Sequence, residues 1–573
     1  MNLVDVVGER IKKNVLGLGA NEKEWRILII DQDTANLLHH SIPMSEVLSH
    51  NIAMIERLEE ERSPSKDFTA IYFVKMNSAK AKRIQKDVTN KMYPSAWVVS
   101  MCSLEKKDEE VMESLVKKAE KHRKKNGALQ FIYKTVIFDF ISISADVFQL
   151  CSEGSFYTSK ETYLNSVSEK IRGLSRTIHT MFTPIPVGKH AQELATRLDT
   201  TGPGKIIIVE RGVDLNTPLM HFFTFESMLW DLGLGGPGYV IEVQKETKKP
   251  AQEEIKEGAE QKEKNTALKE ETPQEDEEKK IEMNREHTVW ESIKNTQLIK
   301  AHEILTELVK ETTKSVEKEK KGNIKRLVRA VQELPAQTRT LKEIKILMGL
   351  LEECVEYFNR NGIREVAELE QGMVTGKTSD GKTYKKVAAK ELMGVLESCR
   401  LTQEEKHRLY VLFVYNYGSL ERNEQKHLIE RGHLRKEFLE EAEEAKKHLF
   451  GRKILALSKR SEAISRYVPS VCDIVNGVLT KDERICAHFE IPVVASNDVL
   501  TGASLRKREF VFKAPAGAET SERKPVIVYF IGGVCISEIT EIREISKNTG
   551  QCILIGSTEI FSPNDFLKKF RRL

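Results

Sequence analysis

Two aspartates near the start of the chain are the first residues whose type and spacing could do chemistry. The run Arg26–Ile30 is apolar after its first residue, which is typical of a strand buried on both faces of a parallel sheet. Asp31 and Asp33 follow it directly. Doubly wound α/β proteins bind their ligands at the carboxyl ends of such strands, so the acidic pair stands where a reactive site is expected.

The segment Asp31-Gln-Asp33-Thr34 resembles the nucleophile loop of haloacid-dehalogenase-type phosphatases. In that family the first aspartate attacks phosphorus, the second transfers a proton, and Mg²⁺ bridges the carboxylates. The later aspartate pair and the lysine of those enzymes have no clear counterpart in this chain. Helix-capping and surface roles explain the same residues, so an Mg²⁺-dependent phosphatase using Asp31 and Asp33 is kept as an alternative.

A glycine pair, Gly532 and Gly533, lies between the apolar run Val526–Ile531 and an expected helix at Ser537–Lys547. Backbone N–H groups at such a turn could face a phosphate. The spacing G-x-G-x-x-G is not satisfied, however. Close packing of the helix on the strand explains two glycines as well.

The elements that would position these groups form two α/β sets and a helical body. Expected strands of the first set are Arg26–Ile30, Ala70–Val74, Ala96–Val99 and Phe131–Tyr133, with helix-like segments at Met44–Glu61 and Ser78–Asn90. Expected strands of the second set are Val136–Phe138, Lys205–Val209, Tyr239–Ile241, Val526–Ile531 and Cys552–Ile555. A C-terminal strand–helix–strand is too small for its own core, so we expect it to complete the second sheet.

The middle of the chain is expected to be helical and inserted between the two parts of the second sheet. It opens with residues 244–280, which hold no aromatic residue and are dominated by Glu, Lys and Gln, as in a solvated linker or frayed helix. Amphipathic runs follow at Val289–Glu311, Ile324–Leu334, Leu341–Asn359 and Ala388–Tyr417.

Composition excludes several classes of protein. Lys and Arg number 90 against 86 Asp and Glu, and a net charge of +4 over 573 residues gives no reason to expect a nucleic-acid binder. None of the eight cysteines forms a C-x-x-C pair, which disfavours structural zinc and a disulfide scaffold. The longest apolar stretch, Val526–Ile536, is shorter than the ~18–20 residues of a membrane span. We expect a soluble protein of the cytosol.

The segment Val209–His221 carries the most specific pattern in the chain. A predicted strand is followed by Glu210-Arg211-Gly-Val-Asp214, and then by Pro218 and His221. It resembles the signature of the SM (Sec/Munc-type) family of syntaxin-binding regulators of SNARE assembly, although Glu210 stands where that family usually has Asp. Three further blocks agree in family order, at residues 370–382, 465–475 and 530–563.

The resemblance implies an arch-shaped protein with two parallel-sheet α/β domains and an inserted helical domain. Domain 1 is expected at residues 1–136 and binds syntaxin. Domain 2 is expected at 137–243 and 478–573. Domain 3, mostly helical, is expected at 244–477, with the charged segment 244–280 and a helical-hairpin tip at about 285–362.

The resemblance also implies function. SM proteins are not enzymes and need no cofactor or metal. We expect binding to a syntaxin-type SNARE and to the assembled SNARE bundle, and a role in templating that bundle for vesicle docking and membrane fusion. The stretch Glu370–Lys382 favours the exocytic, plasma-membrane branch; a Golgi or vacuolar member is the alternative. The protein should be a monomer alone, cytoplasmic, and peripheral at plasma or vesicle membranes through SNAREs.

A SNARE is a long amphipathic helix, so its receptor needs an apolar groove with a charged rim. One apolar stripe in the expected hairpin has helical spacing: Leu341, Ile344, Met348, Leu351 and Val355. Core packing within the protein explains the same pattern, but the resemblance matches this stretch to the SNARE-contacting tip. Pro335 lies between two expected helices, and a proline ends or bends a helix. The resemblance implies that Pro335 is the hinge of the hairpin; a plain helix terminator is the alternative.

The remaining expected sites also come from the resemblance. Asp31 would make charge contacts with syntaxin, although Asn36 replaces a basic residue expected nearby. A groove for an N-terminal syntaxin peptide would involve Met112, Leu115 and Tyr133. Structural roles fall to Arg211, Asp214, Pro218, His221, Gly532 and Gly533, with an Arg211–Asp214 pair fixing the strand–helix junction.

Overall fold

The computed structural model divides the chain into two compact units. Unit 1 comprises residues 1–222 and 360–573, and unit 2 comprises residues 223–359. The structure describes all residues other than 19–23, 104–108, 115, 118–129, 152–153, 245–276, 284–286, 320–323, 378–383, 385–387, 449–464, 493–523 and 571–573. The domain boundaries expected from the sequence remain predictions.

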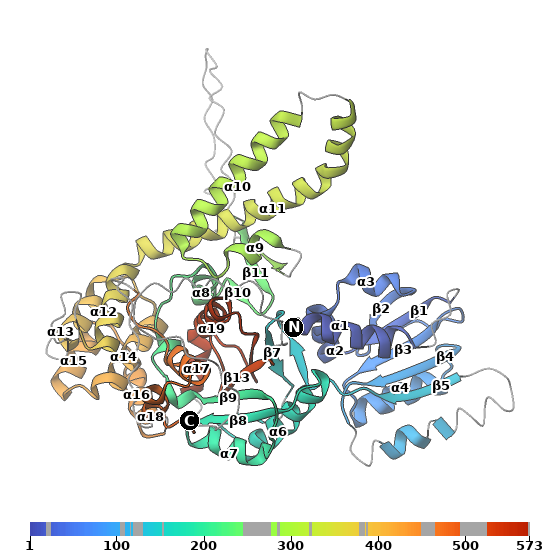
Figure 1. Cartoon of the computed structure of the whole chain (residues 1–573), viewed down its shortest axis with the longest axis horizontal. Coiled ribbons are helices and arrows are strands. Elements are labelled where there is room, and N and C mark those ends of the chain that lie inside the picture. The colour runs from blue at the N-terminus through green and yellow to red at the C-terminus, as the bar shows by residue number, and fades with distance from the viewer. Residues whose placement is uncertain are drawn as a thin grey trace, which may run out of the picture. The chain divides into compact units, whose positions relative to one another are not determined.

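The first sheet of unit 1 is parallel throughout, with strand order β2-β1-β3-β4-β5 (Figure 1). The strands are β1 Arg26–Ile30, β2 Ile52–Arg57, β3 Thr69–Val74, β4 Ser95–Ser100 and β5 Gln130–Thr135. Side chains of β1 enter two cores in alternation: Leu28 and Ile30 enter one, Ile27 and Ile29 the other. Helices α1 Leu3–Ile11 and α2 Gln32–Ser41 contribute to the first core and α4 Ser78–Thr89 to the second, so every position of β1 after Arg26 is apolar.

Strand β2 was not predicted, because the segment Met44–Glu61 has a helix-like pattern. The helix α3 spans only Met44–Ser49. Asn51 then adopts a φ of +59°, a left-handed conformation that asparagine tolerates, and β2 begins at Ile52. Within the described chain β2 pairs with β1 alone and only Ile52 is fully buried, so β2 lacks the continuous apolar run of an inner strand.

The second sheet of unit 1 has the strand order β6-β7-β14-β13-β9-β8. Its strands are β6 Phe140–Ser142, β7 Val147–Leu150, β8 Phe182–Val187, β9 Gly204–Glu210, β13 Val526–Ile531 and β14 Ile553–Ser557. All pair in parallel apart from β6 with β7. Four helices alternate with these strands or follow them along the chain: α6 Lys160–Thr177, α7 Lys189–Leu198, α19 Ile536–Thr549 and α20 Pro563–Phe570. The C-terminal strands therefore lie in the middle of the sheet, as the sequence predicts.

Two strands predicted for the second sheet are wrong. Residues Val136–Phe138 form no strand. The Val136 N–H donates to the carbonyl of Ser100, the last residue of β4, and the Phe138 N–H donates to that of Met101. The side chains of Val136 and Phe138 are buried, which accounts for the apolar run. The predicted strand Tyr239–Ile241 lies instead in unit 2. There β11 Tyr239–Gln244 pairs antiparallel with β10 Gly235–Gly236 and β12 Glu277–Glu282.

Strand β12 also corrects the expectation for the charged segment 244–280. Gln244 ends β11 and residues 277–280 belong to β12, while 245–276 lie outside the described residues. Backbone pairing with β11 accounts for a strand with so many charged side chains, because ladder hydrogen bonds do not depend on side-chain type.

The helices of unit 1 beyond the sheets begin at residue 363. They are α12 Ile363–Thr375, α13 Ala388–Ser398, α14 Gln403–Tyr417, α15 Arg422–Glu430, α16 Lys436–His448, α17 Ser470–Thr480 and α18 Glu483–His488. The predicted run Ala388–Tyr417 is two helices, because Thr402 starts a new one. Its hydroxyl accepts from the Glu405 N–H while the Glu405 carboxylate accepts from the Thr402 N–H, which completes a capping box.

Unit 2 holds α8 Phe225–Asp231, α9 Thr288–Ile293, α10 Leu298–Glu319 and α11 Ile324–Arg360, the last of which ends at the unit boundary. Helix α11 runs through Pro335, so the prediction that this proline separates two helices is wrong. Among the described helices, none has the length and apolar character needed to cross a membrane.

The turn after β13 brings two glycines into close contact with neighbouring side chains. Gly532 and Gly533 adopt φ values of +89° and +100°. A Cβ on Gly533 would lie 2.2 Å from the ring of Phe561. Both the backbone conformation and the packing therefore require glycine, as the sequence suggested for this strand–helix junction.

We predict that Gly533→Ala lowers the free energy of unfolding by about 2–4 kcal/mol, because it adds a steric clash to an unfavourable φ. Urea unfolding of the full chain measures the loss. Gly376→Ala is the matched control: its φ is +68°, and a Cβ there meets no atom within 4 Å. Equal effects of the two substitutions would contradict the close approach of Phe561.

Candidate functional site

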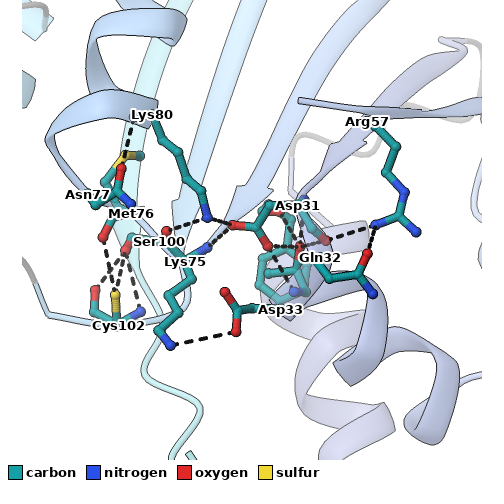
Figure 2. Close-up of polar contacts among 12 residues, drawn as sticks. Asp31, Gln32, Asp33, Arg57, Lys75, Met76, Asn77, Lys80, Ser100 and Cys102 are labelled. Atoms are coloured by element: carbon teal, nitrogen blue, oxygen red, sulfur yellow. Dashed lines mark hydrogen bonds and ion pairs between the residues drawn. The ribbon is translucent and has the colours of Figure 1, made fainter. Parts of the chain in front are cut away.

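Asp31 begins helix α2 at the carboxyl end of β1, and all of its carboxylate contacts are with the protein (Figure 2). Oδ1 accepts from the N–H and the hydroxyl of Thr34, both at 2.9 Å. Oδ2 accepts from the Lys75 N–H at 2.7 Å and from Lys80 Nζ at 2.5 Å. The side chain is fully buried.

These contacts do not fit the phosphatase alternative. A nucleophilic carboxylate needs an oxygen that can reach phosphorus, and an Mg²⁺ ligand needs a lone pair that can reach the metal. Four donors occupy the two oxygens of Asp31. Asp33 is about half exposed and lies 3.6 Å from Lys75 Nζ. The pair acts in capping and charge pairing.

The accessible groups around Asp31 form a small charged surface. We call Gln32, Asp33, Arg57 and Lys75 the β1–β3 rim, because they surround the carboxyl ends of these two neighbouring strands (Figure 2). Arg57 Nη1 donates to the Asp31 carbonyl at 3.3 Å and to Gln32 Oε1 at 3.4 Å. The strand order reverses between β1 and β3, and open α/β sheets bind ligands at such a point.

Lys75 and Lys80 were missed in the sequence analysis, although Lys75 carried a signal. It directly follows the predicted strand Ala70–Val74, as Asp31 follows β1. Carboxyl ends of adjacent parallel strands meet at one edge of a sheet, so the two residues had to be neighbours. Lys80, in α4, offered no comparable signal.

Arg211 lies at the carboxyl end of β9 and pairs with a residue far along the chain. It starts the 3-10 helix Arg211–Val213, and its two terminal nitrogens donate to the two carboxylate oxygens of Glu538 at 2.8 and 2.7 Å. Burial alone would lower the pKa of Arg211, but the charge of Glu538 and its hydrogen bonds, with smaller contributions from Cys535 and Asp214, together raise it. The predicted Arg211–Asp214 ion pair is wrong: Asp214 offers Arg211 its backbone carbonyl, at 3.1 Å from Nε.

The carboxylate of Asp214 instead joins two distant parts of unit 1. It accepts from the N–H and hydroxyl of Thr217 at 3.0 and 2.6 Å. It also accepts from the Tyr467 hydroxyl and the Ser470 N–H, both at 2.9 Å. Burial and the nearby Asp214 charge raise the pKa of Tyr467 well above its ordinary value, so this hydroxyl stays a donor.

His221 completes the same loop. Its N–H donates to Glu370 Oε2 and its Nδ1 lies 2.8 Å from Oε1, with both side chains buried. Burial alone would raise the pKa of Glu370, but the charge and hydrogen bonds of His221, with Arg408, lower it. Pro218 is buried in the 3-10 helix Thr217–Leu219. We call Arg211–His221 the junction loop, since it joins the second sheet to helices of the same unit.

The predicted stripe on α11 splits into two columns. Ile344 and Leu351 are buried, at 2% and 1% exposure. Leu341 and Val355 are exposed at 38% and 42%, and Met348 is partly exposed. We call Leu341, Met348 and Val355 the open column. Other buried residues of α11, which the sequence analysis did not select, are Leu347, Leu350 and Cys354.

The predicted groove for an N-terminal peptide does not have its expected lining. Met112 is fully buried in the second core of the first sheet. Tyr133 is partly buried against that core, with its hydroxyl 3.1 Å from Thr135 Oγ1. Leu115 lies outside the described residues. Met112 therefore has no exposed surface for a peptide.

A family model described as the Sec1 family matches residues 26–569. This match includes the junction loop, both sheets and α11.

The chain belongs to the Sec1 family.

The chain is similar to a Sec1 protein over nearly all of its length, at low identity. The protein transport protein sec1 of Schizosaccharomyces pombe is 22% identical over 96% of this chain and 82% of its own length.

Solved structures share the fold. The Unc18–syntaxin 1 complex from Monosiga brevicollis matches at a TM-score of 0.74 and 16% identity, covering 100% of this chain and 99% of that chain. The SM protein Vps45, in complex with the Qa SNARE Tlg2, matches at 0.72 and 14% identity, covering 100% and 98%. The predicted family and the α/β-plus-helical fold class are confirmed.

We predict that Glu538→Gln lowers the free energy of unfolding by about 3–5 kcal/mol, because the Arg211 charge stays buried without its counter-charge. Urea unfolding measures this loss. Glu161→Gln is the control, since Glu161 is 75% exposed in its pair with Arg197 and its removal should have no measurable effect. A Glu538→Gln protein as stable as the wild type would contradict the importance of this pair.

The lowered pKa of Glu370 predicts a pH dependence. The ionised carboxylate stabilises the folded chain fully above the ordinary glutamate pKa of about 4.3, and this contribution is lost as the pH falls through the lower folded value. Glu370→Gln should therefore be less stable than the wild type at pH 7, and the gap should narrow below pH ~4.3. Unfolding of both proteins from pH 3 to 7 measures the gap.

Glu365→Gln is the control for this pH experiment, because Glu365 is exposed on the same helix. It should show a small gap at every pH. A Glu370→Gln gap that stays constant with pH would contradict the assigned shift.

Proposed function

We propose that this Sec1-family chain binds a syntaxin-type SNARE and templates assembly of the SNARE bundle during vesicle docking and fusion. The observation that carries the proposal is the open column on α11. Two proteins that share the fold support the choice of partner: the solved structures are of Unc18 with syntaxin 1 and of Vps45 with the Qa SNARE Tlg2.

The open column suits an amphipathic helix as ligand. Leu341 and Val355 expose 38% and 42% of their surface, next to the buried Ile344 and Leu351. Between them lies Met348, whose flexible side chain adapts to different packing partners. A helix that covered the column would bury these three side chains from water.

The β1–β3 rim is the second proposed contact surface. Asp31 itself is buried and cannot touch a partner, so its part is to position the rim through the backbone of Lys75 and the side chain of Lys80. The exposed charges are those of Asp33 and Lys75, at 49% and 45% exposure. Arg57 supplies a basic group where Asn36 leaves none.

The proposed mechanism is binding without catalysis. A template lowers the cost of ordering two SNARE helices by holding one of them in its assembled conformation. Pro335 remains our proposed hinge, because a proline lacks the N–H that would hold the next turn of α11 to the preceding one. A change at this point would alter the helix before the open column.

We place the activity on the exocytic route, in the cytoplasm at plasma or vesicle membranes, with SNAREs providing the membrane contact. The Glu370–Lys382 stretch supports this route, through its resemblance to the plasma-membrane branch of the family. A Golgi or vacuolar route is the alternative. The partner captured in the experiment below decides between them.

We predict that purified chain captures one syntaxin-type cytosolic domain from a panel, and that Met348→Glu weakens this capture at least about tenfold. A buried glutamate without a partner costs more than about 1.4 kcal/mol, which is a factor of ten in affinity. Pull-down followed by titration of the captured domain measures the change.

Gln192→Glu is the matched control, because it adds the same charge at an exposed position of α7. It should leave capture unchanged. If Met348→Glu does not weaken capture, the main contact would lie on the β1–β3 rim and not on the open column. Lys75→Glu would then test that surface. Failure to capture any syntaxin or assembled SNARE bundle would refute the proposed function.

A further inference from the structure

Apolar residues of α11 form two columns with heptad spacing, and only one of these columns is buried inside the protein. Leu341, Met348 and Val355 are seven residues apart, and Ile344 and Leu351 follow the first two by three. This is the spacing of a coiled-coil seam, in which the residues of both columns insert between side chains of a facing helix. Ile344 and Leu351 are buried within the chain, whereas the open column is not.

One position of α11, about a quarter turn around the helix from the open column, carries no side chain. Gly349 follows Met348, and no atom lies within 4 Å of the position that its Cβ would take. A glycine in the interior of a helix costs about 1 kcal/mol relative to alanine. Gly349 lies four residues after Lys345 and three before Glu352, so it leaves open space beside these two side chains.

Charges of opposite sign lie on the exposed flank of the column. Lys345 stands three residues before Met348 and Glu352 four residues after it, and both are exposed. Because they are seven residues apart, they form a second line parallel to the open column. Lys342, also exposed, adds positive charge at the same end as Lys345. The flank is therefore basic before Met348 and acidic after it.

We infer that this flank sets the register of the bound helix. The partner is a single amphipathic helix with heptad-spaced apolar residues, acidic side chains opposite Lys345 and basic side chains opposite Glu352. The inference rests on the proposed function and specifies its partner. Sliding the partner by one heptad would place like charges together at one of the two positions, so the charge pattern selects one alignment.

The probe is a synthetic helical peptide with leucine at the a and d positions of four heptads. Its flanking residues are glutamate in the first half and lysine in the second. A second peptide has the same composition with glutamate and lysine alternating. Binding of each to the full chain is measured by fluorescence anisotropy at low salt, where flank charges act most strongly.

The polarised peptide should bind wild type more tightly than the alternating one. Lys345→Glu and Glu352→Lys should each weaken its binding about fourfold, because one attraction becomes one repulsion. The double swap Lys345→Glu/Glu352→Lys should restore binding, since the peptide then lies in the opposite direction. A loss due to misfolding would not be restored by the second substitution. The alternating peptide should not respond to any of the three variants.

Equal binding of the polarised peptide to wild type and all three variants would overturn the inference. If Met348→Glu still weakened that binding, the open column would remain a helix-binding surface. Only the inference that the flank charges set the register would then be refuted. If neither peptide bound wild type, the inference would also fail, while syntaxin capture would still judge the proposed function separately.

Discussion

The buried carboxylate of Asp214 is the constraint on which much of unit 1 depends. It receives donors from its own loop and from Tyr467 and Ser470, about 250 residues further on. In the same loop Arg211 pairs with Glu538 and His221 with Glu370. Each of these groups is buried, so each would carry a large desolvation cost without its partner. The second sheet, the C-terminal part of the chain and the helices of unit 1 are therefore held together by buried charges, and each of these charges needs its partner.

Asp31 follows the same rule in the first sheet. Like Asp214, it stands just beyond a parallel strand, and its oxygens are filled by donors of the protein. Location at a strand end is shared by catalytic and structural carboxylates. The difference lies in whether a lone pair remains accessible, and the donors that decide this come from residues 44 and 49 positions away. A short pattern around Asp31 could not contain that information.

The difference between local sequence patterns and contacts of distant residues also explains which parts of the fold could be predicted. Strands β1 and β13 were located to the residue because helices bury both of their faces, and the resulting apolar run is readable in the sequence. Strand β2 was missed because it is half exposed. The junction loop was recognised as a signature, but the Arg211–Glu538 pair joins residues 327 positions apart and has no local pattern. On α11 the periodicity identified the stripe, whereas only the tertiary structure separates the buried column from the open one.

The position of β13 and β14 has a consequence for synthesis of the chain. Strand β13 lies between β9 and β14, and β14 pairs with β7. The edge of β9 stays unpaired until Ile531 has been made, and the edge of β7 until Ser557 has been made, although both strands were made hundreds of residues earlier. The nascent chain therefore carries an unfinished sheet through most of translation. A premature stop codon before β13 would release a polypeptide with these edges permanently open, a substrate for chaperones and proteases.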